Sequence, residues 1–172
     1  MDQQATLTFA ELLRQMLTGT NLAIFGAALA ALWAGTGSAK GVGMVGSAAA
    51  GLLSEDPGKF GSALVLQALP GTQGIYGLIT AFILVFIKLD MLGTPAVLSV
   101  ADGIYFLFAC LPVAAVGYFS AIHQAKVCVS GIALISKRPK ELGKAITGGA
   151  MVETYAIFAL LISVLLIVIK DI

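Results

Sequence analysis

The sequence predicts an all-α membrane protein whose four transmembrane helices form two tandem hairpins, the second repeating the first in the same direction. Of the 172 residues, 59% are hydrophobic and only 11% are charged, whereas soluble domains carry about 25% charged residues. Apolar stretches recur that are long enough for helices to cross a bilayer, which takes about 20 residues. A shift of 82 positions, which takes Gly35 to Gly117, aligns the two halves without a gap.

Composition narrows the possible partners. The net charge of +1 indicates no acidic partner such as nucleic acid, and lipid is the expected surrounding. The 20 glycines are typical of closely packed membrane helices. Cys110 and Cys128 fit no zinc or redox spacing, so we expect buried packing roles for both.

Residues 1–20 are predicted to form an N-terminal extension. It has neither the basic region nor the small-residue cleavage site of a signal peptide. Thr8 and Glu11 have the spacing of a capping box, and apolar residues follow at helical spacing. A short amphipathic helix at the membrane surface is expected here, with disorder as the open alternative.

The first hairpin is expected over residues 21–88 and the second over residues 95–170. Within them, the first three spans are predicted at residues 21–54, 60–87 and 95–135, and the fourth ends at Lys170. Polar loops separate the spans at residues 54–59, 88–94 and 136–140.

The two copies differ at one position that matters for function. Because each copy has an even number of spans, the copies are parallel, which argues against inverted-repeat transporter folds. Gly71 aligns with Glu153, so the protein has one deep carboxylate per four helices.

Basic residues predict the orientation. The loop between the third and fourth spans carries Lys137, Arg138, Lys140 and Lys144. The positive-inside rule places this loop, with Pro139, in the cytoplasm. The equivalent loop at Pro57 follows it, and both termini then face outward.

Glu153 is the main candidate functional residue. It lies in an apolar run, residues 142–169, whose only other charge is Lys144. An ionisable group at this depth costs at least ~2.5 kcal/mol on insertion scales and normally marks an ion path. Glu153 is 14 positions after Pro139, about 21 Å along a helix, and Gln124 is 15 positions before it, at the same level.

The first hairpin contributes to the same layer. Thr72 and Gln73 lie 15 and 16 positions after Pro57, and Tyr76 follows one turn later. Proline at position 70 disturbs the local helix, so the backbone of residues 69–70 could offer an oxygen to a cation. Such hard oxygen ligands around one negative charge suit a monovalent alkali cation, although Gln and Thr also serve as contacts between membrane helices.

Other polar positions are expected to be structural. His123 points about 100° away from Gln124 on a helix and is expected to pack, while Lys40 and Lys126 are expected to snorkel. Residues 41–46 match the dinucleotide pattern G-x-G-x-x-G, but they lie within an apolar helix. They are therefore interpreted as part of a small packing face, which consists of Gly35, Gly37, Gly41, Gly43 and Gly46.

Three segments are distinctive: residues 69–74 (LPGTQG) followed by a tyrosine, the glycine-rich residues 35–46, and residues 151–156 (MVETYA). Together they resemble the K subunit of bacterial V-type sodium ATPases, the duplicated-hairpin proteolipid of the rotor ring. The resemblance covers the chain from about Ala34 onward. It implies that Glu153 carries the ion and that Tyr76 hydrogen-bonds the carboxylate and locks the site. It also implies the sodium ligands, which are Leu69 (through its carbonyl), Thr72, Gln73, Gln124 and Glu153.

The resemblance further implies a ring of identical subunits in the bacterial plasma membrane. Na⁺ would move on Glu153 as the ring turns past a stator subunit with an arginine. A central stalk would couple this rotation to ATP hydrolysis in the soluble sector. The chain itself is not expected to be an enzyme. Proton coupling is the alternative within this class, but a proton needs only the carboxylate, so Thr72, Gln73 and Gln124 favour sodium. A stand-alone cation carrier or channel and a purely structural oligomer are the alternatives from other classes.

Overall fold

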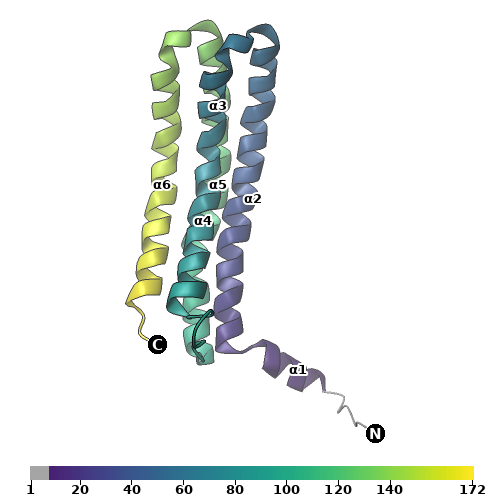
Figure 1. The fold of residues 1–172 in the computed structure, drawn as a ribbon, viewed down its shortest axis with the longest axis vertical. Helices are drawn as coiled ribbons and strands as arrows, with labels where there is room; N and C mark the ends of the chain where they lie inside the picture. The colour runs from purple at the N-terminus through teal and green to yellow at the C-terminus, as the bar shows by residue number, and fades with distance from the viewer. Residues whose placement is uncertain (1–7) are drawn as a thin grey trace.

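The computed structural model describes residues 8–172; residues 1–7 of the predicted extension lie outside the described residues. Four helical rods are long and apolar enough to cross a membrane, at Gly19–Glu55, Pro57–Lys88, Val100–Lys137 and Pro139–Ile169. They run side by side, with both hairpin turns at one end and the C-terminus at the other (Figure 1). The predicted fold of two parallel-repeat hairpins is confirmed.

The first hairpin pairs a continuous helix with an interrupted rod. The continuous helix is α2 (Gly19–Glu55), and Thr18 caps its first turn by accepting a hydrogen bond from the Asn21 N–H. The interrupted rod consists of a 3₁₀ turn (Pro57–Lys59), α3 (Phe60–Ala68), a second 3₁₀ turn (Leu69–Gly71), α4 (Thr72–Phe82) and a π-helical turn (Ile83–Lys88). The interruption comes at Pro70, as the sequence predicts, because proline cannot donate a backbone hydrogen bond.

The second hairpin repeats this pattern with α5 (Val100–Lys137), a 3₁₀ turn (Pro139–Glu141) and α6 (Leu142–Ile169). The two turns have nearly the same backbone angles, φ −139° and ψ 85° at Asp56 and φ −138° and ψ 79° at Arg138. The predicted start of the third span at residue 95 is wrong, because the chain up to Ser99 is not helical. The Thr20 hydroxyl holds this connection by donating to the carbonyl of Ala96 and accepting from the N–H of Leu98.

Small residues bring α2 and α5 together. These two helices form the most extensive contact of the fold, and α6 packs mainly on α5. A Cβ added to Gly37 would lie 2.6 Å from the Cα of Tyr118, so only glycine permits this approach. Cys110 and Cys128 are buried thiols in α5, as predicted.

The predicted small face divides into two sets. Gly37, Gly41 and Gly46 meet neighbouring helices, whereas a Cβ added to Gly35 or Gly43 would have nothing within 4 Å. The first set therefore packs within the chain, as predicted. A Cβ added to Gly74 of α4 would nevertheless lie 3.3 Å from the Gly35 Cα, so Gly35 also packs closely within the chain. The prediction of tight packing is wrong within this chain for Gly43, which is exposed.

Helix α1 (Phe9–Met16) precedes the bundle. It has the predicted capping box, in which the Thr8 hydroxyl accepts from the Glu11 N–H and the Glu11 carboxylate accepts from the Thr8 N–H. The hydrogen bond from the Thr8 backbone lowers the pKa of Glu11. Figure 1 shows α1 leaving the bundle at an angle, at the same end as the C-terminus. Its apolar residues are exposed, and its position at a membrane surface remains a prediction.

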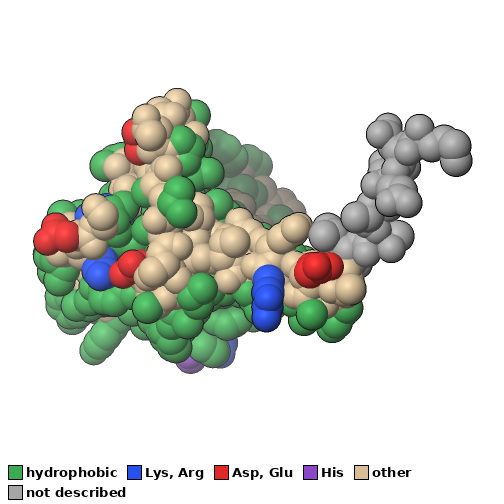
Figure 2. Space-filling model, turned by 90° about the horizontal axis from the view of Figure 1, so that it is seen from below, with side chains coloured by type: hydrophobic (Ala, Val, Ile, Leu, Met, Phe, Trp, Pro, Cys, Tyr) green, Lys and Arg blue, Asp and Glu red, His purple; other side chains and the backbone are tan. Residues whose placement is uncertain are grey.

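Charge is concentrated at the ends of the molecule. The view from the α1 end shows acidic and basic side chains on this surface and hydrophobic side chains around the sides of the bundle (Figure 2). Lys170 and Asp102 form an ion pair of 2.8 Å here, and the hydrogen bond to Asp102 raises the pKa of Lys170. The sides present bare apolar residues, which suit lipid or a second protein.

Candidate ion-binding site

Glu153 on α6 is partly buried, and both of its carboxylate oxygens accept hydrogen bonds. The Tyr76 hydroxyl of α4 donates to Oε1 at 2.5 Å. The Gln124 amide of α5 donates to Oε2 at 3.3 Å. Helices α4 and α5 therefore both hold this side chain of α6.

Two buried glutamines extend the cluster. Gln73 and Gln124 are both 0% exposed. The Gln73 Nε2 donates to the Gln124 Oε1 at 2.5 Å, and the Gln124 Nε2 also donates to the Gly149 carbonyl at 3.1 Å. A chain of hydrogen bonds thus runs from α4 through α5 to Glu153 on α6, at the level that counting from the turns predicts.

One acceptor in this cluster has no partner. The Gln73 Oε1 is the single buried side-chain nitrogen or oxygen within residues 8–172 that makes no hydrogen bond. Leaving a buried acceptor unpaired costs about 1–3 kcal/mol. Gln73 is linked to Glu153 through Gln124, and an unpaired buried oxygen in such a cluster is a group that a bound cation would satisfy.

Thr72 and Leu69 form a separate pair on the broken turn. The Thr72 hydroxyl donates to the Leu69 carbonyl at 3.0 Å, and the Thr72 N–H bonds to the same oxygen. Within the described residues, no hydrogen bond joins this pair to Gln73, Gln124 or Glu153. The structure therefore brings four of the six predicted site residues into one hydrogen-bonded cluster and leaves the other two on the adjacent turn.

Ser120 is a site neighbour that sequence reasoning missed. Its hydroxyl lies 3.4 Å from the Gln73 Nε2 and donates to the Val152 carbonyl at 3.2 Å. Ser38, its counterpart in the repeat, accepts a hydrogen bond from the Gly74 N–H at 2.8 Å. The signal was present in the sequence, since a serine occupies this position in both copies.

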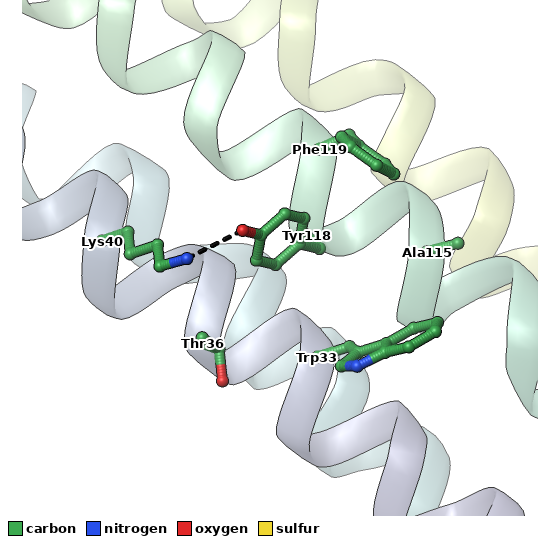
Figure 3. A pocket seen from close by; sticks show the side chains of 6 residues that line it. All are labelled: Trp33, Thr36, Lys40, Ala115, Tyr118 and Phe119. Carbon is green, nitrogen blue, oxygen red and sulfur yellow. Dashed lines mark hydrogen bonds between the residues drawn. The ribbon is translucent and has the colours of Figure 1, made fainter.

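The remaining polar side chains of the spans stay outside the cluster. Lys40 is exposed, and its ammonium donates to the Tyr118 hydroxyl at 2.8 Å (Figure 3); snorkelling of Lys40 remains a prediction. The pair borders a groove of about 490 Å³ between α2 and α5 that contains none of the predicted site residues. His123 and Lys126 are exposed on α5. His123 therefore lies outside the hydrogen-bonded cluster, but its expected packing role is wrong within this chain.

The chain is a duplicated helical hairpin of membrane-spanning length, with one carboxylate bonded among buried amides. The chain belongs to the C-subunit family of ATP synthases, whose model matches it twice, at residues 25–84 and 107–166. The two matches are displaced by the same 82 positions as the internal repeat.

Two characterised relatives cover most of this chain. The V-type sodium ATPase subunit K of Enterococcus hirae is 50% identical over 149 residues, which are 87% of this chain and 92% of that protein. The A-type ATP synthase subunit K of Methanocaldococcus jannaschii is 37% identical over 147 residues, which are 86% of this chain and 62% of that protein. The family suggested by the sequence motifs is confirmed.

Proposed function

We propose that this chain is a rotor-ring subunit of a rotary V-type ATPase and carries Na⁺ across the membrane on Glu153. The observation that supports this most is the partnerless Gln73 Oε1 beside the bonded pair of Gln124 and Glu153. A proton carrier needs the carboxylate alone, whereas buried amide oxygens suit a desolvated alkali cation. The name of the 50% identical relative, a V-type sodium ATPase subunit K, supports the same ion.

The proposed ligands are oxygens from three helices and the broken turn: the Glu153 carboxylate, Gln73, Gln124, the Thr72 hydroxyl and the Leu69 carbonyl. The Thr72 hydroxyl uses its proton on Leu69, which leaves its oxygen lone pairs available to a cation. Tyr76, whose hydroxyl donates to the carboxylate, fixes the orientation of Glu153.

Charge balance explains why one carboxylate is enough. A bare carboxylate within a bilayer is costly, and pairing it with one monovalent cation makes the site neutral. A neutral site can face lipid while the ring turns. At the stator, an arginine supplies the competing positive charge that favours release of Na⁺ from Glu153.

The proposed setting is a multi-pass subunit of a bacterial plasma membrane. Identical copies form the ring, and a central stalk connects it to the soluble ATPase subunits, where the catalysis takes place. The loops at Pro57 and Pro139 face the cytoplasm and both termini face outward, following the excess of basic residues near Arg138.

Carbodiimide labelling of purified rings tests this function, since the reagent modifies a protonated carboxyl. High sodium should protect Glu153 from labelling at constant pH, and Glu153→Gln should abolish the labelling. Equal labelling rates at high and negligible sodium would show that the ring carries protons. A chain that purifies alone, without forming a ring or binding ATPase subunits, would indicate a stand-alone carrier or channel.

A further inference from the structure

Acceptors on α6 fix the direction of the hydrogen bonds around Glu153. The Gln124 amide donates to the Gly149 carbonyl at 3.1 Å and to the Glu153 carboxylate at 3.3 Å. The Ser120 hydroxyl donates to the Val152 carbonyl at 3.2 Å. A carbonyl or a carboxylate can only accept. The atoms that Gln124 and Ser120 present to α6 must therefore be their donors.

This direction is passed on to Gln73 of α4. Because the Gln124 nitrogen is turned to α6, the Gln124 oxygen is left to accept from the Gln73 Nε2, at 2.5 Å. The Ser120 hydroxyl has one hydrogen and uses it on α6, so toward Gln73 it can only accept, and its oxygen lies 3.4 Å from the same Nε2. An amide nitrogen carries two hydrogens, and these two acceptors use both of them.

The Gln73 amide consequently has one favourable orientation. Turning it over would bring its oxygen against the Gln124 oxygen. Turning Gln124 as well would bring an oxygen against the Gly149 carbonyl and the Glu153 carboxylate. Each such contact joins two acceptors without a hydrogen between them, which is unfavourable for buried groups. The Gln73 Oε1 is therefore kept away from both acceptors, and within residues 8–172 it has no hydrogen-bond partner.

The hydrogen bonds form a closed circuit over three helices. One branch runs from Gln73 through Gln124 to Glu153. The other branch runs from Gln73 through Ser120 to Val152, the residue before Glu153 in α6. Gln73 and Gln124 are 0% exposed and Ser120 is 6% exposed. A fully satisfied buried network of this kind rigidifies its members.

We propose that Ser120 is a positioning residue of the cation site: it takes up the second amide hydrogen of Gln73 and so keeps the Gln73 oxygen directed at the ion. Ser120 acts through Gln73 and not as a ligand. The equivalent serine of the first copy, Ser38, has a different task, since it accepts from the Gly74 backbone N–H. The proposal rests on the proposed function and deepens it by adding a residue outside the ligand set.

The benefit for binding is that Gln73 is ordered before the ion arrives. A side chain that has to be immobilised on binding weakens affinity by about two- to tenfold. Gln124 alone leaves the Gln73 amide free to rotate about a single hydrogen bond, whereas Gln124 and Ser120 together hold the plane of the amide. The contribution of Ser120 to sodium affinity should therefore depend on the presence of Gln73.

Ser120→Ala tests this dependence in purified rings. The sodium concentration that half-protects Glu153 from carbodiimide should rise by about two- to tenfold. In a chain that already carries Gln73→Leu, adding Ser120→Ala should cause no further rise, because no amide is left to position. A role in packing alone would give the same rise in both chains, and that result would refute the proposal. An unchanged concentration in the single variant would refute it as well.

Ser163→Ala is the matched control. Ser163 is also a buried serine that links α5 and α6, by accepting from the Val113 N–H at 3.2 Å. It lies outside the circuit, so its loss should leave the half-protecting concentration unchanged, and a rise equal to that of Ser120→Ala would contradict the proposal. If Ser120→Ala rings do not assemble, Ser120→Cys takes their place, because a thiol is only a weak acceptor. It should give the same rise, and wild-type sodium affinity in that ring would rule out the positioning role.

The two proposals fail in different ways. Equal labelling of unmodified rings at high and negligible sodium would overturn the proposed function, and with it the positioning of Gln73 for a cation. Sodium protection of unmodified rings, together with no effect of Ser120→Ala, would overturn the role of Ser120 and leave the proposed function standing.

Discussion

Gln73→Leu is the most informative single change at the site. In the ion-free chain, it removes the partnerless Oε1 of Gln73 but deprives the Gln124 Oε1 of its donor. One unpaired buried acceptor replaces another, so the stability of the ion-free ring should change by less than about 1 kcal/mol. In the sodium-bound ring a ligand is lost, at about 1–3 kcal/mol. Sodium affinity should therefore fall by about one to two decades.

The assay is the sodium concentration that halves the rate of Glu153 labelling, measured beside the thermal stability of the sodium-free ring. Gln67→Leu is the matched control, because it makes the same change on the same rod outside the hydrogen-bonded cluster. It should leave the half-protecting concentration unchanged. An unchanged value for Gln73→Leu, or an equal loss for Gln67→Leu, refutes the role assigned to the Gln73 oxygen.

Three further outcomes are expected. Gln124→Leu should lower sodium affinity by about one to two decades while the ring still assembles; unchanged affinity would remove Gln124 from the site. Tyr76→Phe removes the 2.5 Å hydrogen bond to the Glu153 carboxylate. It should weaken sodium binding by about tenfold or more and speed the release of sodium. A sodium affinity and a release rate equal to those of the wild type would contradict a locking role for Tyr76. Gly41→Ala places a Cβ 2.9 Å from the Ala121 carbonyl oxygen, so it should reduce ring yield and melting temperature. Gly51→Ala, at an open position of the same helix, should change neither. Equal effects of the two substitutions would contradict the packing of α2 on α5.

The depth of the site was predictable because helical hairpins are regular. Counting 14 positions forward and 15 back from Pro139 places Glu153 and Gln124 at one level, and the structure bonds them. The same count placed Thr72 at this level, yet its hydroxyl turns to Leu69. Counting fixes height along a helix, whereas the direction of a side chain depends on the local backbone, which is a 3₁₀ turn here.

Contacts that depend on tertiary packing were not predictable in this way. The bond from Lys40 to Tyr118 requires two helices to pack with a particular rotation, which no pattern within either helix encodes. The role of Ser120 was accessible only in part, since the repeat marked the position without giving it a partner. The start of α5, in contrast, has a local signal that the sequence analysis missed: the Ser99 hydroxyl caps the helix by accepting from the Asp102 N–H.

The single carboxylate per chain has an energetic consequence for the machine. Gly71 stands at the position of the first hairpin that corresponds to Glu153, so under the proposed function a ring of these chains carries one ion per four helices. A single-hairpin ring of equal girth would carry twice as many. If the number of ATP molecules per turn is fixed, fewer ions per turn leave more free energy for each ion. Moving one charge against 100 mV costs about 2.3 kcal/mol, so a low ion count permits transport against a steep gradient.

We therefore expect ATP-driven sodium export to be the main direction of this machine. The measurement is the membrane potential at which net sodium transport stops in vesicles that contain the whole enzyme, at known ATP, ADP and phosphate concentrations. This stalling potential gives the ion-to-ATP ratio, and it should exceed the value for a ring with one carboxylate in every hairpin. A stalling potential as low as that of single-hairpin synthases would overturn this expectation. So would two titratable ion sites per chain, because Glu153 would then not be the only carrier.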